Sequence, residues 1–175
     1  VNKIFKVLIT YLYTIFLTGY GGVIIKFEKV VESHTYDRFG EILYILHKNN
    51  RKYLNDSLAE HDLNLLQAMC MLILLGKETC TQKELTEFLF LTKSGVTKAI
   101  TKLEKDGYIS KEKSPSDSRQ YVLRLTKKGM EMIPTLIEIN NRWEEEVGLN
   151  DLDDEFFEKL KTLAYNAIEL NEKNQ

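Results

Sequence analysis

The chain has 175 residues, the size of one domain or of one compact domain with an extension. Its hydrophobic share of 43% and charged share of 29% are ordinary for a globular protein. Its two cysteines are too few for a disulfide framework, and no cysteine–histidine cluster has the spacing of zinc ligands. This composition excludes a disulfide-stapled secreted domain and predicts a reducing compartment, the cytoplasm.

The net charge of −2 hides an asymmetry along the chain. Residues 76–129 hold 12 lysines and arginines against 7 acidic residues, whereas residues 130–175 hold 4 against 12. Residues 28–75 hold 5 against 7. A basic block between acidic segments is typical of a local nucleic-acid footprint, although a solvated charged surface would give the same counts.

Residues 1–27 form an apolar arm with three lysines and no acidic residue. Within it, residues 7–25 are uncharged over 19 positions, the minimum length for a membrane span. Four interpretations stay open: a signal peptide without a clear cleavage site, a membrane anchor, an extra dimerisation segment, or residues upstream of the true start. We expect the folded domain not to need this arm and the protein not to associate with membranes.

The first two predicted helices differ in character. Apolar residues recur at helical spacing between about residues 36 and 58, which predicts a long amphipathic helix. The second helix is predicted over residues 64–75, with Asn64 as its N-cap and Gly76 as its end. Its sequence LLQAMCMLILL is almost wholly apolar, so we expect it to be buried.

Two short helices are predicted next. Thr81 and Glu84 form a capping box for a helix over residues 82–90, and Thr92 caps a helix that ends at Gly107. Because only Leu91 separates the first helix from the second cap, the pair forms a tight helix-turn-helix.

The second helix of this pair separates its side chains onto two faces. Val96, Ala99, Ile100 and Leu103 form one apolar stripe at helical spacing. The other face carries hydroxyl and ammonium groups without an acid, whereas an ordinary solvated face mixes both signs. Its residues are Lys93, Ser94, Thr97, Lys98, Thr101, Lys102 and Lys105.

The remaining elements are a hairpin and two long helices. Residues 108–113 and 120–125 have strand character and flank the turn SPSDSR, which predicts a β-hairpin. Helices are predicted at about 127–147 and 152–171, and the last has an apolar stripe wide enough to pack against a partner chain. The predicted fold class is mainly α with a small β-hairpin wing: a winged helix-turn-helix flanked by long helices.

These motifs together resemble the MarR family of winged-helix transcription regulators. TKSGVTKAITKLEKDGYI is similar to the family's recognition helix, and DSRQYVLRLT is similar to its wing signature, D-x-R followed after five residues by L-T. The resemblance covers about residues 36–171. Two positions depart from it: Gln120, where the wing often has a second arginine, and Gly95, where a larger residue is usual.

The resemblance implies a sequence-specific DNA-binding transcriptional repressor. It implies a homodimer joined by helices in residues 28–75 and 130–175, with residues 76–129 as the lobe that binds a pseudo-palindromic double-stranded operator. The seven polar residues of the recognition helix would then contact DNA, as would Asp117 and Arg119 of the wing. Arg119 would reach the adjacent minor groove or its backbone, while Asp117 orients it, caps the turn, or does both.

The resemblance also implies a small aromatic or anionic effector in a crevice between the dimer helices and the DNA-binding lobe. Tyr36, Tyr44, His47 and Arg51 are the candidate lining residues, although their helical spacing equally fits plain packing. Cys70 is expected to be inert core. Cys80 has either a structural role or, at a helix start, the lowered pKa of an oxidation sensor.

Two rival functions are a winged helix that binds another protein and a membrane-tethered sensor. The basic recognition face argues against protein binding, which an acidic face would have supported. We expect no enzymatic activity, catalytic residue, metal or cofactor. The sequence contains no phosphate-binding loop, no G-x-S-x-G motif and no paired metal ligands.

Overall fold

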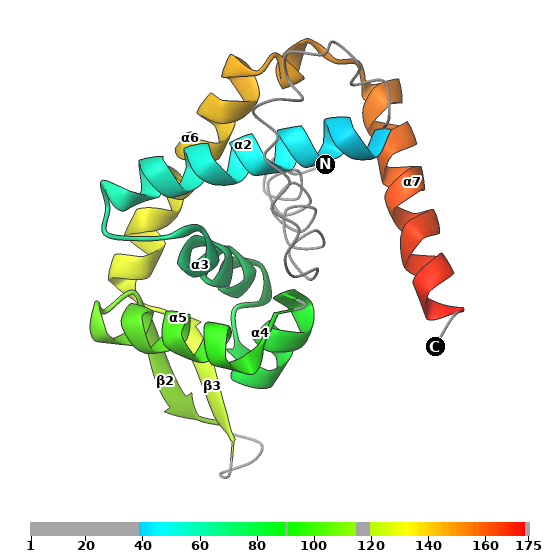
Figure 1. The fold of residues 1–175 in the computed structure, drawn as a ribbon. Helices are drawn as coiled ribbons and strands as arrows, with labels where there is room; N and C mark the ends of the chain where they lie inside the picture. Colours follow the sequence, from blue (N-terminus) through cyan, green and yellow to red (C-terminus); the bar gives the residue numbers. More distant parts are fainter. Residues whose placement is uncertain (1–38, 90, 115–119, 174–175) are drawn as a thin grey trace. The chain divides into compact units, whose positions relative to one another are not determined.

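The computed structural model describes residues 39–89, 91–114 and 120–173. The elements in chain order are α2 (Phe39–Ala59), α3 (Leu65–Lys77), β1 (Cys80–Thr81), α4 (Gln82–Leu89), α5 (Lys93–Lys105), β2 (Ile109–Lys113), β3 (Tyr121–Leu125), α6 (Lys127–Glu146), a 3-10 turn (Leu149–Asp151) and α7 (Asp154–Glu172) (Figure 1). The predicted fold class is confirmed. The chain forms two compact units, Val1–Asn140 and Asn141–Gln175, and α6 runs through the boundary between them.

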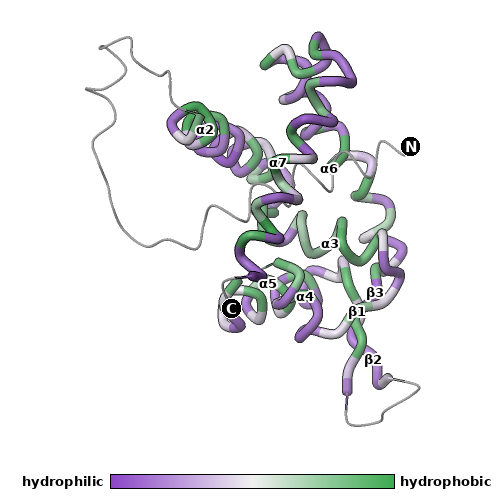
Figure 2. Tube along the Cα trace, turned by 90° about the vertical axis from the view of Figure 1, so that its right-hand side faces the viewer, coloured by the Kyte–Doolittle hydropathy of each residue, from purple (hydrophilic) through white to green (hydrophobic). Residues whose placement is uncertain are grey.

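Helix α3 is the centre of the hydrophobic core of the first unit. Every residue from 68 to 74 is buried, as the apolar sequence predicts, and Figure 2 shows most of the helix as hydrophobic. The predicted cap is present as a capping box. The side-chain oxygen of Asn64 accepts from the Gln67 amide at 3.0 Å, and the Gln67 side chain accepts from the Asn64 amide at 2.9 Å.

The prediction that Gly76 ends α3 is wrong. The helix continues to Lys77, and the residue that leaves the helix with a positive φ of 61° is Glu78. A glycine inside a helix costs about 1 kcal/mol relative to alanine. Burial of the apolar residues that precede Gly76 offsets that cost, since tertiary packing supplies most helical stability in proteins.

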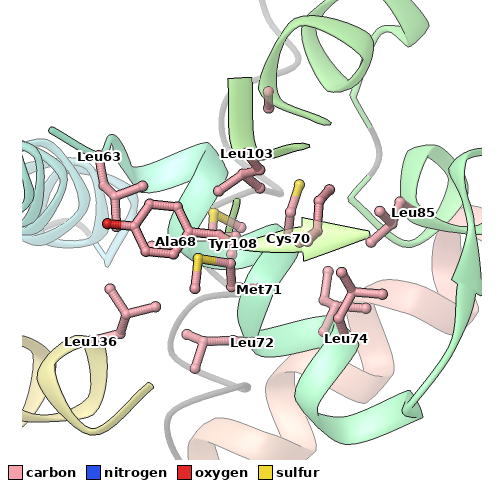
Figure 3. Packing of buried hydrophobic residues seen from close by; sticks show 14 of the residues in the cluster. Leu63, Ala68, Cys70, Met71, Leu72, Leu74, Leu85, Leu103, Tyr108 and Leu136 are labelled. Carbon is pink, nitrogen blue, oxygen red and sulfur yellow. The ribbon is translucent and has the colours of Figure 1, made fainter. Parts of the chain in front are cut away.

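The helix-turn-helix packs on α3 through the predicted apolar stripe. Val96, Ala99, Ile100 and Leu103 of α5 are all buried, and Leu85 and Leu89 of α4 join them. Figure 3 shows Leu103 and Tyr108 in the same cluster as Cys70 and Met71 of α3, with Leu136 of α6. The core therefore holds α5 by one face and leaves its polar face outside.

The described strands form one antiparallel sheet in the order β1-β3-β2. In the hairpin, Ile109 is opposite Leu125 and Lys113 is opposite Tyr121, and the pair extends away from the helices (Figure 1). Strand β1 was not predicted, because two residues show no detectable period. It places Cys80 opposite Leu123 and joins the start of the helix-turn-helix to the wing.

The last two helices lie close to their predicted ranges. The Thr126 hydroxyl accepts from the Gly129 amide at 3.1 Å, Gly148 follows α6 with a φ of 76°, and Asp153 caps α7 by accepting from the Phe156 amide at 2.8 Å. No residue of α7 is buried in this single chain. None of the helices in the described ranges combines the length and hydropathy that a membrane crossing requires. The uncharged segment 7–25 lies outside those ranges.

Candidate nucleic-acid interface

The exposed face of α5 is the centre of the candidate interface. The Thr92 hydroxyl accepts from the Gly95 amide at 3.4 Å and so starts the helix. The predicted side chains on this helix all lie away from the core. Lys102 is half-buried, and the other six are exposed: Lys93, Ser94, Thr97, Lys98, Thr101 and Lys105.

The first turn of α5 has no acidic residue. Among the residues that the structure describes, neither Lys93 nor Lys98 forms an ion pair. The unpaired amides and the dipole at a helix N-terminus add partial positive charge to these ammonium groups. This end of α5 is therefore suited to a polyanion such as a nucleic-acid backbone.

The two threonines of the face have their hydroxyl protons engaged by the helix itself. Thr97 Oγ1 donates to the Lys93 carbonyl at 2.7 Å, and Thr101 Oγ1 donates to the Thr97 carbonyl at 2.9 Å. Thr97 Oγ1 also accepts from Gln82 Nε2 at 2.6 Å. Sequence reasoning missed Gln82; its only signal is that it opens α4, the helix that precedes the recognition helix.

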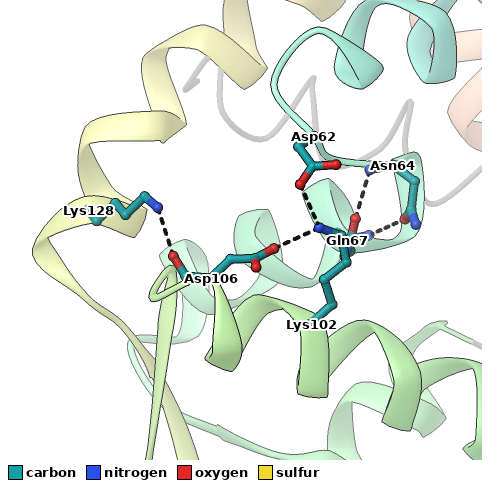
Figure 4. A network of polar contacts seen from close by, with 6 residues as sticks. All are labelled: Asp62, Asn64, Gln67, Lys102, Asp106 and Lys128. Atoms are coloured by element: carbon teal, nitrogen blue, oxygen red, sulfur yellow. Dashed lines mark hydrogen bonds and ion pairs between the residues drawn. The ribbon is translucent and has the colours of Figure 1, made fainter.

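Lys102 lies in a cluster of charges at the other end of α5 (Figure 4). Its Nζ donates to Asp106 Oδ2 at 2.8 Å and to Asp62 Oδ2 at 3.0 Å. The hydrogen bond with Asp106, followed by the one with Asp62, raises the pKa of Lys102. The bond with Lys102 lowers the pKa of Asp106. Asp62 stands between α2 and α3 with a φ of 57°, so the cluster connects α5 to that turn.

This geometry changes the role expected for Lys102. A phosphate would have to compete with two carboxylates that already hold the ammonium group. The predicted phosphate contact at Lys102 is therefore less favoured than those at Lys93 and Lys98. Sequence reasoning could not find this contact, because Asp62 lies 40 residues away in the chain.

Residues at the start of α6 form hydrogen bonds with the residues that follow α5, which we call the exit of α5. Gly107 has a φ of 77°, as its predicted role as the glycine after the helix requires, and its carbonyl accepts from Thr126 Oγ1 at 2.6 Å. The Thr126 amide donates to the Tyr108 carbonyl at 3.0 Å. Lys128 Nζ donates to the Asp106 carbonyl at 2.7 Å and lies 4.4 Å from the centre of the Tyr108 ring.

The wing contributes further cations to the same basic block of the sequence. The predicted residues Asp117 and Arg119 lie outside the described ranges. In the strands, Lys111 Nζ lies 5.0 Å from the centre of the Tyr121 ring. Both residues line an open cleft of about 350 Å³, together with Thr81, Gln82, Lys83, Gln120 and Leu123. Sequence reasoning missed this cleft, which forms only when the start of α4 meets the hairpin.

The candidate effector residues lie on α2, except Tyr36, which is outside the described ranges. Tyr44, His47 and Arg51 follow one another at helical spacing, with Tyr44 and Arg51 exposed. Burial, and then the charge of Arg51, lower the pKa of His47. Within the described residues, His47 Nδ1 is buried without a hydrogen-bond partner.

The cysteines do not have the properties of exposed thiolate sensors. Burial raises the pKa of Cys70 to about 12, and burial followed by the charge of Glu84 raises the pKa of Cys80 to about 11. Of the two alternatives for Cys80, the raised pKa argues against the oxidation sensor and favours the structural role, since the thiol is buried in the unpredicted strand β1. The described residues contain no group of three His, Cys, Asp or Glu side chains that could hold a metal ion.

The order of α4, α5, β2 and β3, with α5 exposed on its polar face, defines a winged helix-turn-helix protein. Residues 61–120 match the sequence model of the MarR family. The HTH-type transcriptional regulator YdcH of Bacillus subtilis (strain 168) is 31% identical over 104 residues, which are 57% of this chain and 71% of that protein. The HTH-type transcriptional regulator BilQ of Clostridioides difficile (strain CD3) is 28% identical over 128 residues, 73% of this chain and 86% of BilQ. This chain belongs to the MarR family of transcriptional regulators.

Solved structures have the same fold. A crystal structure of MarR superposes with a TM-score of 0.69 at 25% identity and covers 79% of this chain and 97% of that chain. The C80S mutant of MarR from E. coli, crystallised in complex with operator DNA, superposes with a TM-score of 0.63 at 16% identity. It covers 81% of this chain and 96% of that chain.

Proposed function

We propose that this regulator binds double-stranded DNA sequence-specifically and represses transcription as a homodimer on a pseudo-palindromic operator. The observation that carries the proposal is the polar face of α5. Six exposed hydroxyl and ammonium side chains lie on a helix whose opposite face is fixed in the core. The operator complex of the MarR mutant, which has the same fold, supports this assignment.

The side chains divide by the part of DNA that they contact. Lys93 and Lys105 contact phosphates, which supply affinity without sequence information. Ser94, Thr97, Lys98 and Thr101 lie in the N-terminal and middle turns and contact base edges or the nearest phosphates. In the wing, Arg119 reaches the minor groove, and Asp117 orients its guanidinium group.

The dimer is formed by segments 28–75 and 130–175, which flank the DNA-binding segment 76–129. Apolar side chains of both flanking segments are exposed in the single chain: Phe39, Ile42 and Leu46 of α2, and Phe156, Leu163 and Ile168 of α7 are 39–54% exposed. A partner chain would remove this apolar area from water. A two-fold dimer then requires half-sites centred about 34–36 Å apart, one turn of DNA.

The regulator acts in the cytoplasm, and a small aromatic or anionic molecule releases it from DNA. Tyr36, Tyr44, His47 and Arg51 are the residues proposed to contact that effector. Arg51 supplies a positive charge for an anion, and the unpartnered His47 Nδ1 supplies one polar atom on the same helix.

The test is genome-wide footprinting of the purified protein, followed by a salt titration on the best site and light scattering at micromolar concentration. We expect a dimer and a retarded complex that weakens steeply with salt. Reversing both charges in Lys93→Glu/Lys98→Glu should abolish retardation. The control Lys159→Glu, an exposed lysine of α7, should leave it intact. A monomer that retards no genomic fragment at low salt would overturn the proposal.

A further inference from the structure

We infer that Thr97 recognises a thymine in each operator half-site through its methyl group, and that Gln82 keeps the Thr97 hydroxyl engaged within the protein. The inference rests on the proposed DNA-binding function. It deepens that proposal by naming the base and the group that recognises it.

The hydroxyl group of Thr97 is occupied twice within the protein. Its proton is donated to the Lys93 carbonyl at 2.7 Å, and its oxygen accepts from Gln82 Nε2 at 2.6 Å. A hydroxyl has one donor and two acceptor positions, so at most one acceptor position is left for DNA. Thr97 therefore has no free donor for a base edge.

The methyl group is the part of the Thr97 side chain that no hydrogen bond engages. The Cβ of threonine carries only a hydroxyl, a methyl and a hydrogen, and here the hydroxyl is held against the helix backbone and the Gln82 amide. The residue is nonetheless exposed. Lys93 lies four residues earlier on the same side of the helix, where its ammonium group would attract the DNA backbone.

Thr101 and Ser94 provide the contrast on the same face. Thr101 donates its proton to the Thr97 carbonyl at 2.9 Å, but no side chain in the described ranges donates to its hydroxyl. The Ser94 side chain carries no methyl group. Thr97 is thus the residue whose hydroxyl is held from two directions while a methyl group remains available.

The chemical partner follows from the edges that DNA displays. In the major groove, adenine, guanine and cytosine present hydrogen-bonding groups, and thymine alone adds a C5 methyl group. A threonine methyl in contact with that group removes apolar surface from water. Burying one methyl contributes about 0.8 kcal/mol, or about fourfold in affinity for each half-site.

The experiment uses operator DNA in which single thymines are replaced by deoxyuridine, which removes only the C5 methyl. Replacing one symmetry-related pair of thymines, those that Thr97 contacts, should lower the wild-type affinity about fourfold per half-site. Thr97→Val, which keeps the methyl and loses the hydroxyl, should bind like the wild type and keep this sensitivity. Thr97→Ser, which does the opposite, should bind about fourfold more weakly per half-site and lose the sensitivity.

Gln82→Met tests the role of Gln82 with a side chain of similar length. Once the amide is gone, the acceptor position that it occupied on the Thr97 oxygen becomes free as well, and the oxygen can compete with the methyl group by accepting from a base amino group. The preference for thymine should therefore weaken, while the melting temperature serves as the control for folding. Unchanged thymine sensitivity in Gln82→Met would remove Gln82 from the inference.

The outcomes separate this inference from the proposed function. Wild-type protein that binds no genomic site overturns the proposed function. Wild-type protein that binds its operator with no effect of any deoxyuridine overturns only the thymine contact. The thymine contact is also overturned if Thr97→Ser and the wild type are equally sensitive to deoxyuridine. It is overturned as well if Thr97→Val loses as much affinity as Thr97→Ser.

Discussion

In the first half of α5, Lys93 and Lys98 form no ion pair within the described residues, whereas in the second half Lys102 lies between the carboxylates of Asp62 and Asp106. At the C-terminal end of this half, Thr126 and Lys128 donate hydrogen bonds to the backbone carbonyls of Gly107 and Asp106. The same residue type thus serves two purposes on one helix. The second half is the anchored half, held by contacts with other elements, whereas Lys93 and Lys98 of the free half stay exposed.

This division explains how a short recognition helix can have a defined orientation and a free face. The core holds α5 along its length, and the contacts at its C-terminal end restrict rotation and sliding. Side chains that read DNA need such support, because a displacement of about 1 Å removes much of their benefit.

The largest effect is expected where α6 meets the exit of α5. In Gly129→Ala, the added Cβ would overlap the Tyr108 carbonyl oxygen and lie 3.1 Å from Leu125 Cδ2. Because a backbone atom cannot move aside easily, the variant should lose about 2–3 kcal/mol of unfolding free energy in urea. In the control Gly40→Ala, the Cβ meets no atom within 4 Å. Equal stability of both variants would show that the exit is not tightly packed.

The second effect concerns the free half. Lys98→Ala should weaken operator binding by about 1.5–3 kcal/mol per half-site if its ammonium bonds a phosphate. The slope of log K against log salt should flatten by about one unit for each phosphate that the variant no longer neutralises. The melting temperature should not change, since the side chain is exposed. A weakened complex with an unchanged salt slope would instead assign Lys98 to a base edge.

The third effect is a gain in stability. In Gly95→Ala, the added Cβ meets only Thr92 Oγ1 at 3.5 Å, an ordinary contact. Alanine should therefore stabilise the protein by about 0.5–1 kcal/mol through helix propensity. Urea unfolding measures this gain, and operator affinity shows whether the new methyl obstructs DNA. A decrease in stability would mean that the start of α5 is less open than its geometry indicates.

The smallest effect is expected for Lys102→Met, because exposed ion pairs contribute little. The lowered pKa of Asp106 means that its contribution is present above the ordinary aspartate pKa of about 3.9 and is lost as the pH falls through the lowered value. The difference in unfolding free energy between the wild type and Lys102→Met should therefore shrink on acidification below about pH 4.

DNA binding separates Lys102 from Lys98. If Lys102 binds Asp62 and Asp106 and not a phosphate, Lys102→Met should leave the salt slope of operator binding unchanged. Lys98→Ala should flatten that slope. Equal flattening in both variants would mean that DNA displaces Asp62 and Asp106 and that Lys102 contacts a phosphate after all.

The sequence alone determined the parts of this protein that depend on residues within about one helical turn of each other. The caps at Asn64 and Thr92, the apolar stripe of α5 and the glycine at 107 were all predicted, because cap chemistry and helical period are local. The basic recognition face followed from the same period. The DNA contacts assigned to that face, and those of the wing tip, stay predictions.

Only the tertiary structure decided the features that join distant segments. Lys102 meets Asp62, Gln82 meets Thr97, and Gly129 lies against Tyr108, at separations of 40, 15 and 21 residues. No local period predicts these contacts, because they depend on how helices and strands pack. The same packing buries Cys80 and raises its pKa, which favours the structural role over the oxidation sensor. It also extends α3 beyond Gly76, since burial outweighs the local preference.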